Sequence, residues 1–504
     1  MKRKNHFLVL TVLILTLCLS LNCIAATAET EPAIVEPIDF QNPDFIRGMD
    51  VSSLITLENA GVNYSTESGV KQDIMQILAE NGVNYIRVRV WNDPYDAEGN
   101  GYGGGNNDVM KAAEIGRRAA LYGMKLSVDF HYSDFWADPA KQKAPKAWSG
   151  MNLNQKCEAV KAFTAESLNT IKNAGADIGM VQIGNETTTG ICGENSWRNM
   201  AQIMNAGSAA VRAFSPDVLV AIHFTNPERT DAIKALADFL HNYNVDYDVF
   251  ATSYYPYWHG SLQNLTNVLN YAAEKYGKYA MVAETSYANT LMDTDGHPNT
   301  VSEWNNNTGD DLLWDFSYEG QAQEVRDVMY AVNKVSDGKG LGVFYWEGAW
   351  ISVGDTRRLG GADYTARVEK NKLIWEKEGC GWAASYSKEY DPDDAGKWYG
   401  GSAVDNQAFF SPLGAALPSL RVFTDVVQDG FLLGDTDCDG TVDSPDVALI
   451  LRVCVGMSVG NKDDVILRGD ADRDGQLTIF DATYIQRYIV GIHTPYPIGI
   501  VTAP

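Results

Sequence analysis

The chain has 504 residues, of which 45% are hydrophobic and 11% aromatic, and it carries a formal net charge of −25. This acidity excludes binding to nucleic acid or to an anionic membrane through a general electrostatic field. The length exceeds that of one ordinary compact domain and accommodates a large barrel followed by a small module. The 12 Trp and 25 Tyr residues suit either a sugar-binding cleft or an aromatic core.

The N-terminus has the three parts of a secretory signal peptide. Lys2, Arg3 and Lys4 form a basic start, residues 7–21 are almost wholly apolar, and residues 26–28 (Ala-Thr-Ala) offer a small-x-small cleavage site. We therefore expect a signal peptide over residues 1–28, an N-terminal tail over 29–44, and a secreted, extracellular protein. Cys23 raises a lipoprotein alternative, but the Leu-Asn before it lacks the small residue of a lipobox. No later stretch is long and apolar enough to span a bilayer.

Eight short runs rich in apolar and β-branched residues follow one another after the tail, and segments with helical periodicity, such as 70–81 and 106–122, lie between them. Runs that are apolar on both faces predict strands covered on both sides. The pattern predicts an α/β fold, a (β/α)8 TIM barrel over residues 45–424. A doubly wound open sheet is the alternative, but no glycine-rich phosphate fingerprint follows the first run. The runs are Ile46–Ser52, Asn84–Val90, Lys125–His131, Ile178–Glu186, Asp217–Phe224, Asp248–Tyr255, Tyr279–Ser286 and Gly340–Glu347.

Two glutamates lie at the carboxyl ends of the fourth and seventh runs, where a TIM barrel places its active residues. Glu186 and Glu284 are 284 − 186 = 98 residues apart, so only the barrel can bring them together. Hydrolysis of a glycosidic bond uses two carboxyl groups that flank the bond. Asn185 precedes Glu186, and its amide can hydrogen-bond a sugar 2-hydroxyl. A structural salt bridge is the competing explanation for any single glutamate at a barrel mouth.

Five cysteines follow the signal peptide at irregular spacings, which indicate neither a disulfide framework nor a zinc site. We expect buried free thiols at Cys157, Cys192, Cys380, Cys438 and Cys454.

Residues 435–446 and 470–481 are two copies of one loop, with an offset of 470 − 435 = 35 residues. Each copy has Asp at positions 1, 3, 5 and 12 and Gly at position 6, a pattern suited to a hard cation such as Ca²⁺. Position 12 departs from an EF-hand, which has Glu there. Helical periodicity follows each loop and little precedes it, so we expect two loop–helix units in a small all-α domain. The expected ligands are Asp435, Asp437, Asp439, Thr441 (carbonyl), Asp443 and Asp446, then Asp470, Asp472, Asp474, Gln476 (carbonyl) and Asp481.

These repeats closely resemble a type I dockerin module. The resemblance implies a linker over residues 425–431, a dockerin over 432–495, a C-terminal tail over 496–504, and two bound Ca²⁺ ions. It also implies docking to a cohesin module of a scaffold protein, as in a cellulosome. Positions 10 and 11, which help to select the partner in that family, are Ser444 and Pro445 in the first copy and Ile479 and Phe480 in the second.

The barrel region resembles glycoside hydrolase family 53, the endo-β-1,4-galactanases. The matching motifs include Arg47-Gly-Met-Asp50, Arg87-Val-Arg89-Val-Trp91, Gly184-Asn185-Glu186, Ser253-Tyr254-Tyr255 and Ala283-Glu284-Thr-Ser. Further matches are residues 129–136 and 345–347. The resemblance implies retaining, double-displacement hydrolysis of β-1,4-galactosidic bonds in pectic galactan (type I arabinogalactan), with Glu284 as nucleophile and Glu186 as acid/base. The remaining implied substrate-binding residues are Asn185, Asp129, His131, Arg89, Tyr254, Tyr255, Trp346, Trp382 and Trp398.

The resemblance further implies that Arg89 and one of the two tyrosines, Tyr254 or Tyr255, hold Glu284 ionised. Glu347 is a rival carboxylate that we expect to be a hydrogen-bonding residue. Bacterial members bind one Ca²⁺ between the loops after the seventh and eighth strands. The residues that match those ligands are Asp293, Asp295, His297 (by its carbonyl), Asn299, Ser402 and Asp405.

We therefore expect a monomeric endo-galactanase with three Ca²⁺ ions, a galactan substrate and a cohesin partner, associated with an extracellular scaffold. One alternative is another endo-glycanase of the same clan, such as a mannanase or cellulase. The other is a non-catalytic carbohydrate-binding protein docked on a scaffold, against which the presence of both glutamates argues.

Overall fold

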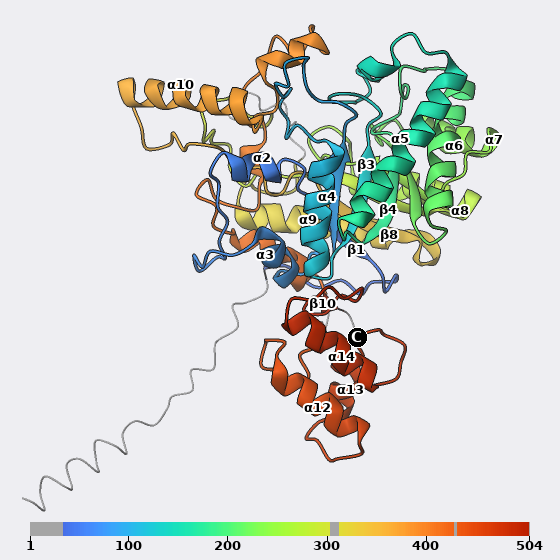
Figure 1. The fold of residues 1–504 in the computed structure, drawn as a ribbon, viewed down its shortest axis with the longest axis vertical. Coiled ribbons are helices and arrows are strands. Elements are labelled where there is room, and N and C mark those ends of the chain that lie inside the picture. The colour runs from blue at the N-terminus through green and yellow to red at the C-terminus, as the bar shows by residue number, and fades with distance from the viewer. Residues whose placement is uncertain (1–33, 303–311, 428–430, 503–504) are drawn as a thin grey trace, which may run out of the picture. The chain divides into compact units, whose positions relative to one another are not determined.

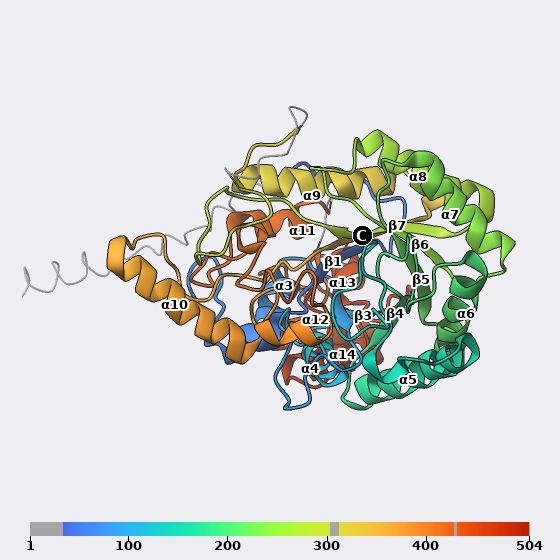
Figure 2. The same cartoon turned by 90° about the horizontal axis from the view of Figure 1, so that it is seen from above.

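The computed structural model describes residues 34–302, 312–427 and 431–502. The predicted signal peptide lies outside these residues. Eight parallel strands close into a barrel in the order β1 to β8, with β8 paired to β1, and helices surround it (Figures 1 and 2). The predicted TIM barrel is confirmed. The strands are β1 Ile46–Asp50, β2 Tyr85–Val90, β3 Lys125–Phe130, β4 Ile178–Ile183, β5 Leu219–Phe224, β6 Val249–Ser253, β7 Tyr279–Thr285 and β8 Gly340–Tyr345.

Each strand coincides with one of the eight predicted runs, but most runs extend one to three residues beyond the carboxyl end of the strand. The extra residues are the polar and aromatic side chains of the barrel mouth. There the backbone leaves the sheet, as at Gly184 and Glu186, whose φ values are 83° and 44°. The carboxyl end of each predicted run thus marks the barrel mouth and not the last residue that pairs in the sheet.

The outer helices begin at side-chain caps that the sequence supplies. Asp108 caps the helix predicted over 106–122, and Asn152 and Gln155 form a capping box at the start of the longest helix. Asp73 caps the helix predicted over 70–81. The barrel helices are α2 Leu54–Asn59, α3 Ile74–Glu80, α4 Val109–Leu121, α5 Leu153–Asn173, α6 Trp197–Phe214, α7 Thr230–Asn242, α8 Leu262–Tyr276, α9 Tyr318–Asn333, α10 Gly361–Glu378 and α11 Val422–Asp425. Short 3₁₀ turns are η1 Lys146–Trp148, η2 Ser336–Gly338, η3 Ser385–Glu389, η4 Asp405–Gln407 and η5 Pro418–Arg421.

The barrel interior opposite the mouth is filled by apolar side chains, which leaves the polar chemistry at the carboxyl ends of the strands. Phe344 occupies much of this space, and a Cβ on Gly48 of β1 would lie 2.1 Å from its ring. Only glycine therefore fits at this position of β1. The interior cluster consists of Ile46, Tyr85, Met180, Ala221, Val249, Ala251, Met281, Ala283, Leu341 and Phe344.

The C-terminal region contains β9 Phe431–Leu432, α12 Ser444–Cys454, α13 Lys462–Gly469, α14 Ile479–Ile489 and β10 Val501–Thr502. Both predicted loop-following helices are present. The expectation that no helix enters a loop is wrong for the second copy, because α13 ends at Gly469, directly before Asp470. Its first turn begins with three charged residues, Lys462, Asp463 and Asp464, which hid its short apolar stripe from the periodicity. β9 and β10 pair antiparallel, although Phe431 ends the predicted linker, Leu432 begins the predicted dockerin and β10 lies in the predicted tail.

The five cysteines are free thiols. Cys192 and Cys380 are buried and Cys157 is half-buried, but Cys438 and Cys454 are exposed, so the expectation of burial is wrong for these two. Both lie in the C-terminal region, whose small core does not reach them. Within the described part of the chain, no helix is long and apolar enough to cross a membrane.

Candidate active site

A cleft of about 360 Å³ opens at the carboxyl ends of the barrel strands, and both Glu186 and Glu284 line it. Glu186 follows β4 and is half-buried, whereas Glu284 is the sixth residue of β7 and is 6% exposed. The two predicted carboxylates thus meet at one site. Other lining residues include Arg87, Asp129, His131, Trp136, Asp138, Lys141, Asn185, Tyr255, Trp258, Trp346, Trp382 and Gln407.

Arg87 of β2 is the cation that pairs with Glu284. Its Nη2 lies 2.8 Å from Glu284 Oε1, and the same nitrogen donates to Asn185 Oδ1 at 3.0 Å. It also forms buried ion pairs with Asp50 at 3.0 Å and Asp129 at 2.9 Å. The prediction that Arg89 holds Glu284 is therefore wrong. Strand alternation places both arginines on the interior face, and the residue deeper in the strand is the one that reaches Glu284.

Arg89 instead anchors the wall of the cleft. Its Nη1 lies 2.6 Å from Glu347 Oε1, and its guanidinium carbon lies 4.4 Å from the ring centroid of Trp136. Glu347 is 2% exposed and also accepts a hydrogen bond from Ser53 Oγ at 2.7 Å. It is not among the residues that line the cleft. The rival carboxylate is thus a buried hydrogen-bonding residue, as expected.

Of the two candidate tyrosines, Tyr255 contacts Glu284. Its hydroxyl donates to Glu284 Oε2 at 3.0 Å. Tyr254 is buried and donates to the carbonyl of Gly260 at 2.9 Å, away from the cleft, so its predicted contact with the substrate is not supported by its position. The two side chains diverge because they are the first and second residues after β6, where successive residues still point to opposite sides.

The surroundings of the two glutamates differ in charge. Burial, and then the negative charge of Glu284, raise the pKa of Glu186 to about 8. Burial also raises the pKa of Glu284, but Arg87 and the hydroxyl of Tyr255 oppose that rise. No ion pair involves Glu186 within the described chain, so a single proton shared by the pair resides on Glu186.

Asp129 and His131 of β3 and the following loop form a fixed pair beside Arg87. The indole nitrogen of Trp91 donates to His131 Nδ1 at 3.0 Å, so His131 Nε2 carries the hydrogen and donates to Asp129 Oδ2 at 3.1 Å. Burial alone would raise the pKa of Asp129, but Arg87 and His131 lower it below its usual range. Both predicted residues line the cleft, as does Asn185.

Aromatic side chains border the cleft. Trp346 and Trp382 line it, as predicted. Trp398 is 69% exposed and is not among the lining residues, so the structure does not bring it to the cleft. Trp136 and Trp258 line the cleft and were missed, although Trp136 belongs to the matching motif over residues 129–136. The signal that could have found them is their place in loops that directly follow strands β3 and β6.

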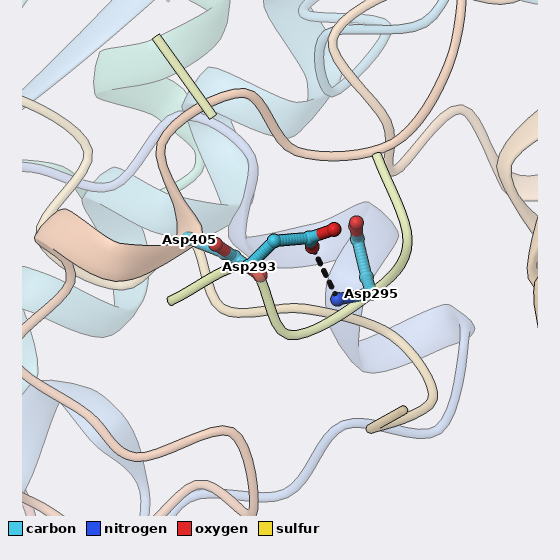
Figure 3. Close-up of side chains that lie close together, drawn as sticks. All are labelled: Asp293, Asp295 and Asp405. Atoms are coloured by element: carbon cyan, nitrogen blue, oxygen red, sulfur yellow. Dashed lines mark hydrogen bonds between the residues drawn. The ribbon is translucent and has the colours of Figure 1, made fainter. Parts of the chain in front are cut away.

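Three carboxylates meet between the loops that follow β7 and β8. One oxygen from each of Asp293, Asp295 and Asp405 lies within 4.8 Å of the other two (Figure 3). Burial and the charge of Asp405 raise the pKa of Asp295, and burial raises the pKa of Asp405 to about 7. Because like charges are crowded and partly dehydrated, a divalent cation fits this cluster.

The other predicted ligands of this cluster lie around it. Asn299 is fully buried, and its Oδ1 has no hydrogen-bond partner among the residues that the structure describes, while its Nδ2 donates to Asp405 Oδ1 at 2.7 Å. The backbone amides of His297 and Ser402 donate to Asp295 at 2.8 and 3.1 Å. The free Oδ1 of Asn299 suits a cation, whereas ligation by His297 and Ser402 stays a prediction.

Each C-terminal loop brings three of its aspartates together. The first cluster is Asp435, Asp437 and Asp446, and the second is Asp470, Asp472 and Asp481. Asp446 and Asp481 also accept hydrogen bonds from backbone amides of their own loops. The amide of Thr436 donates to Asp446 Oδ1 at 2.7 Å, and the amide of Ala471 donates to Asp481 Oδ1 at 2.9 Å. The position-12 aspartate is therefore the residue that closes each loop, as the shorter side chain requires.

The remaining predicted ligands of these loops are not brought into the clusters. Asp439 Oδ1 accepts from the amide of Thr441 at 2.9 Å, and Asp474 Oδ1 accepts from the amide of Gln476 at 2.8 Å. Asp443 lies outside the cluster too, although its Oδ1 is buried without a partner. Carbonyl ligation by Thr441 and Gln476 stays a prediction.

The sequence model of glycosyl hydrolase family 53 matches residues 46–423, which is most of the chain and the whole barrel. The chain belongs to this family. The family 53 match ends before the C-terminal loops, so it carries no information on them.

Named relatives align with much of the chain. The chain is 56% identical over 394 residues to a protein of Bacillus subtilis (strain 168) named endo-beta-1,4-galactanase, an alignment that spans 78% of this chain and 88% of that one. It is 32% identical over 320 residues to an arabinogalactan endo-beta-1,4-galactanase of Humicola insolens, spanning 60% and 90%. The solved family 53 catalytic domain of Ignisphaera aggregans superposes with a TM-score of 0.68 at 36% identity, covering 79% of this chain and all of that one.

Proposed function

We propose that this family 53 glycosyl hydrolase is an endo-β-1,4-galactanase that cleaves pectic galactan with retention of configuration. The observation that carries the proposal is the unequal pair at the cleft, in which Glu284 is held by Arg87 and Tyr255 while Glu186 has no cation partner among the described residues. The names of the relatives from Bacillus subtilis and Humicola insolens supply the substrate class.

In this mechanism the ionised Glu284 attacks the anomeric carbon while Glu186 protonates the departing glycosidic oxygen. The covalent glycosyl-enzyme removes the charge of Glu284, so the pKa of Glu186 falls and Glu186 then accepts a proton from the attacking water. Asn185, fixed by Arg87, is placed to bind the sugar 2-hydroxyl. Trp346 and Trp382 offer apolar faces on which galactose rings stack.

The nucleophile is tested with Glu284→Ala on linear β-1,4-galactan. We expect hydrolysis to fall by roughly four orders of magnitude or more, because no other carboxylate of the described residues pairs with Arg87 and Tyr255 at this position. Glu347→Gln is the matched control for the loss of a buried carboxylate. This variant should still form the covalent glycosyl-enzyme at Glu284. Substantial galactan hydrolysis by Glu284→Ala would remove Glu284 from the proposed role.

Retention is tested by NMR of products during the first turnovers. The β-anomer should appear first and convert to the equilibrium mixture by mutarotation. An α-anomer as the first product would contradict the double displacement and would require a water molecule between the two carboxylates.

We further propose that Ca²⁺ binds at Asp293, Asp295, Asn299 and Asp405, with His297 and Ser402 as additional oxygen ligands. Bound there, the ion would neutralise the carboxylates and tie together the loops after β7 and β8. It takes no part in the chemical steps, which use carboxylates alone. The crowded carboxylates, with the pKa of Asp405 raised by burial, and the unpartnered Oδ1 of Asn299 support this assignment.

We also propose that the C-terminal region is a dockerin that binds two Ca²⁺ ions and a cohesin module, and that the protein is secreted to an extracellular scaffold. The two aspartate clusters, one in each repeat, support the assignment of a dockerin with two Ca²⁺ ions. The predicted signal peptide supports secretion. Isothermal titration with a panel of cohesin modules, with and without Ca²⁺, tests the partner directly.

A further inference from the structure

A serine and a histidine that do not line the cleft form a hydrogen-bond chain to Glu186. Ser253 is the last residue of β6, and its Oγ lies 2.6 Å from Glu186 Oε1. Behind it, His223 of β5 places Nε2 at 2.9 Å from the same Oγ. Both side chains are fully buried, and neither is among the residues that line the cleft. They therefore act on Glu186 without access to the sugar.

The direction of this chain is fixed at His223. The backbone N–H of Glu186 donates to His223 Nδ1 at 3.3 Å, so Nδ1 has no hydrogen of its own. Asn185 Oδ1 lies 3.1 Å from Nδ1 but already accepts hydrogen bonds from Arg87 and Gln182. The hydrogen of the neutral imidazole is therefore on Nε2, which must donate to Ser253.

Because Ser253 Oγ accepts from His223, its own hydrogen is directed to Glu186 Oε1. Oε1 is then an acceptor in both protonation states of Glu186, and the proton can occupy only Oε2. The burial of His223, and the neighbouring charge of Arg87, lower its pKa well below the usual range, which keeps the imidazole neutral and the direction of the chain unchanged.

We propose that His223 and Ser253 are positioning residues that reserve Oε1 of Glu186 as a permanent acceptor, so that Oε2 alone gives up and regains the catalytic proton. This inference rests on the proposed role of Glu186 as acid and base. The same oxygen then serves both half-reactions, and the carboxyl group needs no rotation between them.

The chain also stabilises the charged form of Glu186, because a hydroxyl that donates to a carboxylate favours ionisation. Loss of Ser253 should therefore raise the pKa of Glu186, and the alkaline limit of activity should move to higher pH. The other groups that act on Glu186 are Glu284 of β7 and Asp138 after β3, which both raise its pKa, and the side chain of Thr225 after β5, which lowers it. The titratable groups that act on His223 are Arg87, Asp129 and His131.

The experiment compares Ser253→Ala with Ser253→Thr, which restores the hydroxyl, and with Thr252→Val. The last change removes a neighbouring buried hydroxyl that, among the described residues, bonds to the backbone carbonyl of Ser253 and not to its side chain. For Ser253→Ala on β-1,4-galactan, we expect kcat to fall roughly ten- to a hundredfold with little change in KM. The alkaline limb of the kcat/KM profile should move to higher pH by on the order of one unit. Ser253→Thr should recover most of both effects, and Thr252→Val should show neither.

A second pair of variants tests the histidine. His223→Gln keeps a neutral donor directed toward Ser253, whereas His223→Phe removes it, so the first should retain more kcat and a less shifted alkaline limb than the second. Melting temperatures of all variants separate these effects from loss of folding.

Glu186→Ala is measured in parallel. If it still hydrolysed galactan at the wild-type rate, both the proposed function and this inference would fall. If Glu186→Ala were inactive but Ser253→Ala kept the wild-type alkaline limb, or lost activity through KM alone, only the inference on Ser253 and His223 would be overturned.

Discussion

At the scale of single residues, Arg87 is the side chain on which the reactivity of Glu284 depends. Replacement by Gln removes the nearest cation from a buried carboxylate, and such losses cost about 3–5 kcal/mol. We expect Arg87→Gln to lower kcat/KM by roughly a hundredfold or more. The acid limb of the pH profile should move to higher pH, since Arg87 lowers the pKa of Glu284.

Arg89→Gln is the control for this prediction, because Arg89 pairs with Glu347 and not with Glu284. It should destabilise the protein without moving the acid limb. If the limb moved for Arg89→Gln and stayed in place for Arg87→Gln, the assignment of the two arginines would be reversed.

Glu324 of α9 gives a second prediction at this scale. It is fully buried, its Oε1 accepts from Thr285 Oγ1 at 2.8 Å, and its Oε2 has no partner. Burial raises its pKa to about 8. Because its pKa is higher in the folded state, Glu324 contributes fully to the free energy of unfolding below its unfolded pKa of about 4.5. That contribution is lost as the pH rises through the folded pKa of about 8.

Glu324→Gln keeps the shape and removes this titration. Its melting temperature should match that of the wild type near pH 4 and exceed it by roughly several degrees near pH 8. Equal melting temperatures at both pH values would show that Glu324 is not neutral in the folded protein. Circular dichroism melts of the two proteins, run side by side, provide the measurement.

Residue-level prediction from the sequence succeeded where position along a strand decides the matter. Glu186, Glu284, Asp129 and His131 all come from strand ends and all line the cleft. It failed where the depth of a side chain in the barrel decides its partner. Arg87 and Arg89 point to the same face of β2, and only the three-dimensional structure shows that Arg87 reaches Glu284.

At the scale of elements, the turn η4 links the proposed cation cluster to the cleft. It begins with Asp405, a member of the cluster, and ends with Gln407, which lines the cleft and accepts a hydrogen bond from Ser286. Asn406 between them donates to the carbonyls of Thr290 and Val301 at 2.7 and 2.8 Å, both in the loop after β7. The position of Gln407 therefore depends on how well this turn is held.

We expect added Ca²⁺ to raise the melting temperature of the barrel and to lower KM for galactan, because the ion stabilises the native state in which it binds. Asp405→Asn should abolish both responses. Asp393→Asn, an exposed aspartate of the same long loop, should respond like the wild type. Differential scanning calorimetry with and without chelator provides the measurement, and an unchanged response of Asp405→Asn would contradict the assigned ligands.

Elements were predictable where hydrophobic periodicity is strong. All eight strands were located, because each is an apolar run covered on both faces. Helix α13 was missed because it has only eight residues and a polar first turn. The pairing of β9 with β10 joins two-residue strands about seventy positions apart, and no local pattern carries that information.

At the scale of the whole molecule, catalysis and attachment are assigned to separate parts of the chain. Residues that line the cleft all belong to the barrel, whereas the two repeat clusters belong to the C-terminal region. Asp435→Ala combined with Asp470→Ala should therefore abolish cohesin binding and Ca²⁺-dependent protection of that region from proteolysis. The rate of galactan hydrolysis by the same variant should equal that of the wild type.

The control for this variant is Asp437→Glu with Asp472→Glu, which keeps the number of carboxylates in each loop. Cohesin binding that survived the double alanine change would contradict the account of the loops. A parallel loss of galactan hydrolysis would show that the two functions are coupled.

The most direct test of the central claim is to size the products formed early from linear β-1,4-galactan, with β-mannan and cellulose as parallel substrates. An endo-acting galactanase should release a spread of galacto-oligosaccharides while most of the polymer is still long, and should leave the other two polysaccharides intact. Release of galactose alone, or cleavage of mannan or cellulose in place of galactan, would contradict the proposed function.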